Sequence, residues 1–157
     1  MADLQIGILT CSDTRGVAQD TAGQALAQLI AERGWTVAPY QVCTDDSSAI
    51  QAAIVSMCDA GADIVLTCGG TGLGPRDVTP EATLAVCDRL ALGIAEHIRA
   101  ESLKVTGRAM LSRATSAVRG TTLVVNLPGS EKAARECFGF IADQFEHAVA
   151  MMAGKGH

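Results

Sequence analysis

The residues best suited to chemistry lie between Leu66 and Thr83, in the segment LTCGGTGLGPRDVTPEAT. The segment contains a turn with three glycines, which are Gly69, Gly70 and Gly72. Without Cβ atoms, such a turn lets backbone N–H groups approach a ligand, and these donors suit an anion such as phosphate. Arg76 and Asp77 follow, and a cation and an acid serve little purpose in a plain turn. The alternative is a tight connection that binds nothing.

The residues on either side of this turn indicate a strand and a helix. The apolar run 63–67 is too short for a helix and rich in β-branched residues, which is typical of a buried strand. Thr79, Pro80 and Glu81 resemble a helix start, with a hydroxyl N-cap, a proline at the first helical position and an acid in the first turn. The glycine turn is therefore expected to connect a strand to a helix.

The remaining chain alternates between strand and helix patterns, and it predicts a single α/β domain over residues 1–157. Further strands are expected at 4–10 and 36–42, where Pro39 indicates an edge. One helix is expected from a cap at Asp20 to Gly34, and a second from a cap at Asp45 or Asp46 to Gly61. A third is expected to start at Pro80 and, after a break near Gly93, to continue to residue 103. The last is expected to start at Ser130 and to follow an apolar stripe to residue 152. Residues 114–118 and 121–127 read as a hairpin around Arg119-Gly120, and 106–113 stays unassigned. This order predicts a three-layer α/β/α fold whose sheet is mostly parallel, with a late antiparallel hairpin.

In sheets of this kind, ligands bind at the carboxyl ends of the strands. Four loops, 11–16, 43–48, 68–77 and 128–130, are then expected to share one crevice. Its polar side chains would be the hydroxyls of Ser12, Thr71 and Ser130, the acids Asp13, Asp45 and Asp77, and Arg76.

The residue types in this crevice narrow the chemistry. No histidine lies in the four loops, so Ser-His-Asp catalysis and zinc binding are poorly supported. Acids beside a phosphate-binding turn suggest Mg²⁺ held by a few carboxylates and by substrate phosphates. A phosphate nucleophile, with a second pKa of about 6, is mostly ionised at neutral pH, so phosphoryl or nucleotidyl transfer can proceed by positioning and charge neutralisation. The turn is neither a P-loop nor a dinucleotide fingerprint, and the residues alone leave the substrate open.

The composition of the chain argues against several other classes of protein. A 157-residue chain with 48% hydrophobic and 18% charged residues can bury a substantial core and is not disordered. Its net charge of −5 argues against nucleic acid as the main partner, and no apolar run reaches the ~18 residues of a bilayer span. The six cysteines form no Cys-x-x-Cys pair and no signal peptide is seen, so reduced thiols and a cytoplasmic location are expected. Packing is the expected role of Cys11 and Cys68.

At residues 67–83 the chain resembles the molybdenum-cofactor biosynthesis family that includes MogA, MoaB and the G domain of gephyrin. The resemblance runs nearly end to end. Further segments similar to the family's are Ile8–Asp13, Asp20–Gly23, Leu111–Arg113 and Asn126–Ser130. Thr44 departs from the pattern, because relatives often have proline before the aspartate of this loop. The short C-terminus is closer to the compact MoaB subgroup.

The resemblance implies a molybdopterin-binding fold and the transfer of AMP from Mg-ATP to the terminal phosphate of molybdopterin, with release of pyrophosphate. It implies Asp45 and Asp77 as catalytic residues and as Mg²⁺ ligands. The implied molybdopterin-binding residues are Gly69, Gly70, Thr71, Gly72, Arg76 and Thr79, and the implied nucleotide-binding residues are Ser12, Asp13, Pro128, Gly129 and Ser130. A homotrimer or homohexamer is also implied. The retained acids favour an active enzyme, and the alternative is a molybdopterin carrier or scaffold without chemistry.

Overall fold

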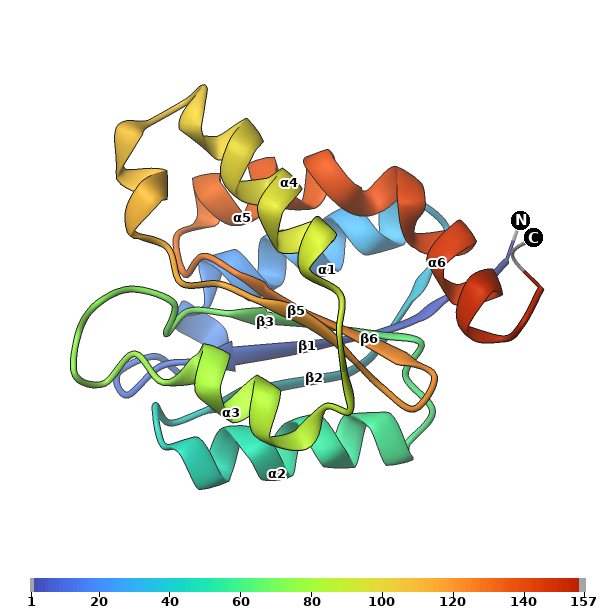
Figure 1. Cartoon of the computed structure of the whole chain (residues 1–157). Coiled ribbons are helices and arrows are strands. Elements are labelled where there is room, and N and C mark those ends of the chain that lie inside the picture. The colour runs from blue at the N-terminus through green and yellow to red at the C-terminus, as the bar shows by residue number, and fades with distance from the viewer. Residues whose placement is uncertain (1, 156–157) are drawn as a thin grey trace.

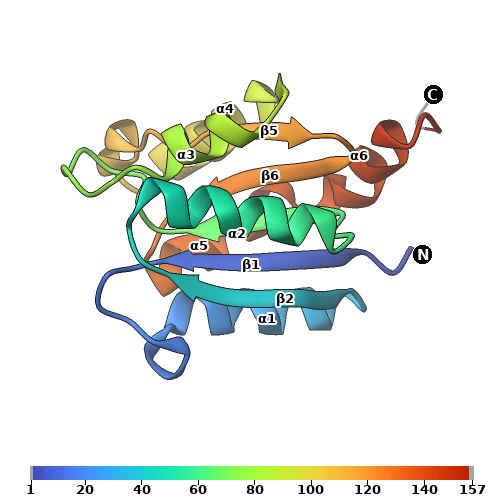
Figure 2. The same ribbon diagram turned by 90° about the horizontal axis from the view of Figure 1, so that it is seen from below.

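The computed structural model describes residues 2–155, and within them a six-stranded sheet lies between two layers of helices (Figure 1). The strands, in the order in which they neighbour one another, are β2 (Thr36–Cys43), β1 (Gln5–Cys11), β3 (Ile64–Cys68), β6 (Thr122–Leu127), β5 (Ser116–Arg119) and β4 (Arg89–Leu90). The first four run parallel, and β5 and β4 are antiparallel to their neighbours (Figure 2). The predicted three-layer architecture with a late antiparallel hairpin is confirmed, and Pro39 lies in an edge strand.

The two helical layers bury opposite faces of the sheet. Helices α1 (Thr21–Glu32), α4 (Leu92–Leu103), α5 (Glu131–Ile141) and α6 (Phe145–Met152) cover one face, and α2 (Ser47–Asp59) and α3 (Thr79–Val86) cover the other (Figure 1). Because side chains alternate along a strand, Ile8 and Cys68 belong to the first core, whereas Leu9 and Cys11 belong to the second. Cys11 and Cys68 therefore lie on opposite faces. Burial raises the pKa of the Cys68 thiol to about 12, which is consistent with a packing role.

The helix caps predicted at Asp20, at Asp45 or Asp46, and at Ser130 form where the sequence indicates them. Asp20 accepts a hydrogen bond from the N–H of Gly23 (3.0 Å) and others from the hydroxyls of Thr10 and Tyr40. Asp46 caps α2 through the N–H of Ala49 (2.9 Å), and Ser130 caps α5 through the N–H of Ala133 (3.3 Å). Since Asp46 takes the capping role, Asp45 is left free for the crevice.

The predicted break between the two helices is present, but it lies before Gly93. Helix α3 ends at Val86, and α4 begins at Leu92, so Gly93 lies inside its first turn. The intervening residues pair with β5, where the N–H of Asp88 donates to the carbonyl of Val118 (2.9 Å) and the N–H of Ala91 donates to that of Ser116 (2.9 Å). Because residues 88–91 pair with this edge of the sheet, the helix ends earlier than the sequence pattern predicts. The same pairing forms β4, which the apolar periodicity does not predict.

Two further segments differ in detail. The apolar stripe from Ser130 to Met152 is carried by α5, a short 3-10 turn over Ala142–Gln144 and α6, in place of one continuous helix. The hairpin turn is shifted by one residue, because Arg119 pairs with Thr122 and leaves Gly120 (φ +59°) and Thr121 in the turn. The unassigned segment contains a 3-10 helix over Gly107–Leu111. Within residues 2–155, no helix has the length and hydropathy that crossing a bilayer requires.

Candidate functional site

The four loops predicted to share one crevice follow β1, β2, β3 and β6, which run parallel, so all four lie at the same edge of the sheet. The loops after β1 and β2 exchange two hydrogen bonds, from the N–H of Asp13 to Asp45 Oδ2 (3.2 Å) and from the N–H of Asp45 to Asp13 Oδ1 (3.0 Å). Arg15 Nη1 reaches the carbonyl of Gly129 (3.2 Å) and so connects the first of these loops to the loop after β6. The segments predicted to share one edge therefore contact one another.

The glycine loop (residues 69–77, between β3 and α3) begins with two left-handed residues, Gly69 (φ +93°) and Gly70 (φ +71°). A Cβ on Gly69 would lie 2.6 Å from the carbonyl oxygen of Cys11, and its N–H already donates to Leu127 (3.0 Å). Gly69 thus joins the loop to the sheet, and its N–H is not available to a substrate. Within residues 2–155, the N–H groups of Gly70, Thr71 and Gly72 donate to no protein acceptor, which leaves them free for an anion.

The prediction that Thr79 is an N-cap is wrong. Val78 holds the N-cap position without a side-chain bond, and Thr79 is the first residue of α3. The N–H of Thr79 donates to the carbonyl of Gly70 (3.1 Å), so the backbone of the glycine loop caps the N-terminus of α3. The buried Thr79 hydroxyl is directed toward Gly70, where an added Cβ would lie 2.2 Å from Thr79 Oγ1.

Two buried oxygen atoms in the crevice lack a hydrogen-bond partner among the described residues: Asp45 Oδ1 and Thr79 Oγ1. Both lie within 3.4 Å of the position that a Cβ on Gly70 would occupy. Buried polar atoms are nearly always paired, and leaving one unpaired costs about 1–3 kcal/mol. These two oxygens beside Gly70 are therefore the candidate ligand-contacting atoms of the site.

The surroundings of Asp45 disfavour the charged form of its carboxyl group. Burial raises the pKa of this carboxyl above its ordinary value, and the nearby charges of Asp13 and Asp77 raise it further. A carboxyl whose pKa is raised by folding lowers stability once the pH passes its unfolded pKa, because the unfolded chain then ionises more readily. The negative field at Asp45 favours a cation.

We therefore expect Asp45→Asn to raise the melting temperature at pH 7 by a few degrees, and the difference should shrink as the pH falls toward 4. The amide keeps an oxygen for the N–H of Asp13 and removes the buried charge. Asp46→Asn is the matched control, since loss of its charge beside the N-terminus of α2 should lower the melting temperature slightly. Scanning calorimetry at both pH values measures this, and a lower melting temperature for Asp45→Asn at pH 7 would contradict it.

Arg76 and Asp13 form an ion pair across the mouth of the crevice. Arg76 Nε and Nη2 donate to the two carboxylate oxygens of Asp13, each at 3.0 Å. This pairing lowers the pKa of Asp13. The Arg76 side chain remains 63% exposed, so an anionic substrate could exchange with Asp13 for the guanidinium.

Asp77 closes the glycine loop on itself. Its Oδ2 accepts a hydrogen bond from the N–H of Gly74 (2.9 Å) and lies 2.9 Å from the position of an added Cβ on Gly72. Helix α3, which follows, is held to the sheet by Asn126, whose Nδ2 donates to Thr67 Oγ1 (2.9 Å) and Thr83 Oγ1 (3.0 Å). The Asp77 carboxylate is therefore placed by short local contacts on a fixed support.

The residues predicted to bind the nucleotide adjoin the glycine loop, with Asp13 paired to Arg76 and Gly129 against Gly69. Ser12 Oγ accepts hydrogen bonds from the N–H groups of Thr14 (3.3 Å) and Arg15 (3.2 Å), and Ser130 Oγ caps α5. Either hydroxyl can still donate its own proton. Gly129 packs against Gly69, with an added Cβ only 3.3 Å from the Gly69 Cα. These residues and the glycine loop thus border one space, and their ligand roles remain predictions.

Arg113 is the functional candidate that residue patterns missed. It lies in a segment that was unassigned in the sequence, yet its guanidinium reaches the carbonyls of Gly72 and Asp77 and the carboxylate of Glu81. Its only signal in the sequence is the resemblance of Leu111–Arg113 to a family segment. The contact between Arg113 and the glycine loop could not be predicted from residue patterns, because the two segments are far apart in the sequence.

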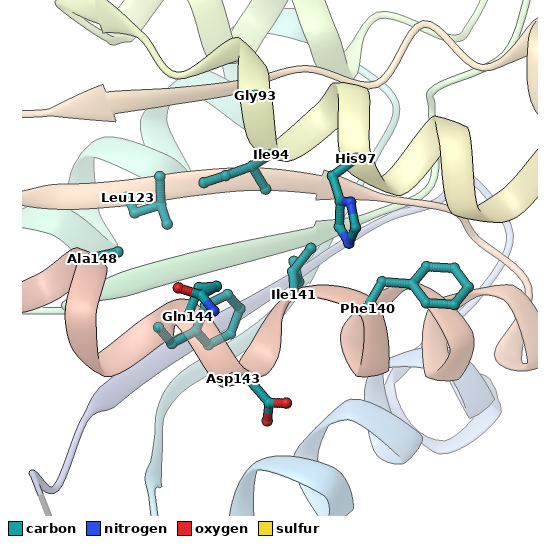
Figure 3. A pocket seen from close by; sticks show the side chains of 10 residues that line it. Gly93, Ile94, His97, Leu123, Phe140, Ile141, Asp143, Gln144 and Ala148 are labelled. Atoms are coloured by element: carbon teal, nitrogen blue, oxygen red, sulfur yellow. The ribbon is translucent and has the colours of Figure 1, made fainter.

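A cavity of about 390 Å³ lies away from this crevice, between α4 and the segment from Phe140 to Ala148 (Figure 3). Ile94 and Leu123 contribute to its apolar lining, and the exposed His97 stands at its side. None of the predicted site residues lines it. The polar chemistry is concentrated in the open crevice at the sheet edge.

Comparison with known proteins agrees with this geometry. Residues 7–147 match the family described as "Probable molybdopterin binding domain". A molybdopterin adenylyltransferase of Helicobacter pylori is 35% identical over 98% of this chain and 90% of its own, and a molybdenum cofactor biosynthesis protein B of Bacillus cereus is 39% identical over 85% and 80%. The crystal structure of the molybdopterin biosynthesis enzyme MoaB from Thermus thermophilus superposes with a TM-score of 0.89 at 42% identity, covering 97% of this chain and 98% of that one. On its fold, its crevice and these relatives, the chain belongs to the molybdopterin-binding domain family of molybdenum cofactor biosynthesis proteins.

Proposed function

We propose that this protein is a molybdopterin adenylyltransferase, which transfers AMP from ATP to the terminal phosphate of molybdopterin. The observation that carries the proposal is the pair of unpartnered buried oxygens, Asp45 Oδ1 and Thr79 Oγ1, beside the free N–H groups of the glycine loop. Donors for a phosphate and acceptors for a cation thus meet in one crevice. Relatives that carry this enzyme name align over nearly the whole chain.

The reaction needs little proton chemistry from the protein. An oxygen of the molybdopterin phosphate attacks the α-phosphorus of ATP, the bond from that phosphorus to the bridging oxygen breaks, and pyrophosphate leaves with the electron pair. The attacking phosphate is mostly ionised at neutral pH, which fits a crevice without a histidine base. In this proposal the N–H groups of residues 70–72 hold the molybdopterin phosphate, and the flank formed by Ser12, Asp13 and Pro128–Ser130 borders the nucleotide.

The crevice residues fit Mg²⁺. Hard oxygen donors suit this ion, and it is usually bound by one or two carboxylates together with substrate phosphates. Asp45, with its unpartnered Oδ1 and raised pKa, and Asp77, whose charge acts on Asp45, would hold it. When bound, Mg²⁺ supplies neutralisation of the charge that develops on the phosphates.

The test is pyrophosphate release by the purified protein with molybdopterin, ATP and Mg²⁺. We expect release that requires all three and stoichiometric formation of adenylylated molybdopterin, detected by mass spectrometry. Titration calorimetry with each substrate alone separates the alternative. Tight molybdopterin binding with no ATP affinity and no pyrophosphate would overturn the proposal in favour of a carrier or scaffold.

We further propose a reducing, cytoplasmic setting and a homo-oligomer, a trimer or hexamer. All six cysteines are free thiols, which suits a reducing compartment. The oligomer is supported by the exposed apolar side chains of Leu90, Leu92 and Met151, which are between 47% and 60% exposed.

A further inference from the structure

We propose that Arg113 is a positioning residue that sets the geometry of the glycine loop and, through it, of Asp77. The inference rests on the proposed adenylyl transfer for its kinetic consequence, whereas its structural consequence stands without it. Arg113 touches no reacting atom in this proposal and acts on the backbone that carries the acid.

The contacts of Arg113 span the whole loop. Its Nε donates to the carbonyl of Gly72 (2.8 Å), its Nη2 to the carbonyl of Asp77 (2.6 Å), and its Nη1 to Glu81 Oε2 (2.7 Å). Its own N–H donates to the carbonyl of Thr71 (2.8 Å). One residue from the segment before β5 therefore holds both ends of the turn and the first turn of α3.

The planar guanidinium makes this arrangement stiff. Its donors form a rigid fork, so two carbonyl oxygens that bind its Nε and Nη2 are held at a set separation. Gly72 and Asp77 are the two residues so joined, and the stretch between them is closed by the bond from the N–H of Gly74 to Asp77 Oδ2 (2.9 Å). The position of the Asp77 carboxylate thus follows from that of the Arg113 side chain.

The loop has few other supports. It projects from the edge of the sheet (Figure 1), and residues 73–76 are exposed. Within residues 2–155, the side chains outside the loop that hydrogen-bond residues 70–77 belong to Arg113 and Asp13, and Asp13 binds only the guanidinium of the exposed Arg76. The Arg113 side chain is itself only 36% exposed, whereas that of Arg76 is 63% exposed. Arg113 is therefore the main external support of the loop backbone.

The proposal predicts a loop-specific effect. In Arg113→Met, which keeps much of the apolar stem and removes every side-chain donor, the hydrogen-bonded backbone amides of Gly74, Asp77 and Thr79 should exchange with deuterium at least about tenfold faster, because the loop opens locally. Exchange in β1 and β3 should stay unchanged. Arg113→Lys retains one ammonium that cannot span both carbonyls, so it should show an intermediate rate.

In the AMP-transfer assay, Arg113→Met should lower kcat by about 10- to 100-fold, the scale of a misplaced reacting group, with the KM for ATP changed only a few-fold. Arg113→Lys should recover part of kcat. Arg119→Met is the matched control, because Arg119 Nη1 donates to the carbonyl of Val86 (2.7 Å) at the far end of α3. Glu81→Gln removes the ion pair and keeps an acceptor for Arg113, and it should leave kcat near that of the wild type.

Mass-spectrometric hydrogen exchange and steady-state kinetics together test the positioning role of Arg113. Faster exchange confined to the amides of Gly74, Asp77 and Thr79, together with a lower kcat, supports the positioning role. Unchanged loop exchange, or faster exchange spread evenly over the chain in both Arg113 variants, overturns it. If the wild-type protein transfers no AMP, the proposed function fails, and the exchange comparison still tests the role of Arg113.

Discussion

Replacing Asp77 with alanine is expected to lower kcat for AMP transfer by at least about 10²–10³-fold, the scale of losing one group that stabilises charge in the transition state. Asp45→Ala should do the same. In both variants molybdopterin binding should stay within a few-fold of the wild type, because the free N–H groups of the glycine loop remain. Rapid-quench measurement of AMP transfer and calorimetric titration with molybdopterin separate the two effects.

The two acids differ in what their removal does to the fold. Asp77→Ala loses one loop bond, from the N–H of Gly74, whereas Asp45→Ala loses a bond between the loops after β1 and β2. Asp77→Asn keeps an oxygen for Gly74 and removes only the charge, so it should be as inactive as Asp77→Ala. Asp59→Ala, at the exposed far end of α2, is the control and should keep full activity. An Asp77→Asn variant with wild-type kcat would show that the charge of this acid is not used.

Gly70→Ala is expected to destabilise the protein by about 2–5 kcal/mol and to abolish AMP transfer. The left-handed backbone (φ +71°) costs an L-residue about 1–2 kcal/mol, and forcing atoms into a filled space costs about 1–3 kcal/mol more. The new Cβ would lie 2.2 Å from Thr79 Oγ1 and 3.4 Å from Asp45 Oδ1, beside both unpartnered oxygens. Urea unfolding and the AMP-transfer assay measure the two effects.

Gly61→Ala is the control that separates the cost of a left-handed backbone from the cost of placing a Cβ against neighbouring atoms. Gly61 also has a left-handed backbone (φ +93°), but an added Cβ there meets nothing within 4 Å. This variant should lose only about 1–2 kcal/mol and retain its activity. If Gly70→Ala were active and no less stable than Gly61→Ala, the space beside Gly70 would have no ligand role.

Much of the fold could be predicted because its signals are local. The caps at Asp20, Asp46 and Ser130 depend on side chains bonding N–H groups three residues away, and each forms as expected. Period-2 and period-3.6 apolar patterns also predicted the layers. The errors occur where distant pairing overrides local preference, as at β4, whose residues leave the helix to pair with β5.

The candidate site shows the same division. The chain order of strands and loops was enough to bring Asp13, Asp45, Asp77 and the glycine turn to one edge, because parallel strands end together. Which groups are free there depends on contacts that residue types do not specify. Gly69 donates to Leu127, Arg76 is paired with Asp13, and the buried Thr79 hydroxyl oxygen has no hydrogen-bond partner among the described residues.

By itself, the sequence determined the α/β class, the edge where the site forms and the acids that line it, since these follow from periodicity, capping and strand order. Only the tertiary structure decided that Asp45 Oδ1 and Thr79 Oγ1 are buried beside Gly70 without a hydrogen-bond partner among the described residues, and that Arg113 supports the loop from about forty residues away along the chain. The physical reason is the short range of the interactions that define the site. Hydrogen bonds and desolvation act over a few ångströms in space, so groups far apart in sequence acquire their roles only when the fold brings them together.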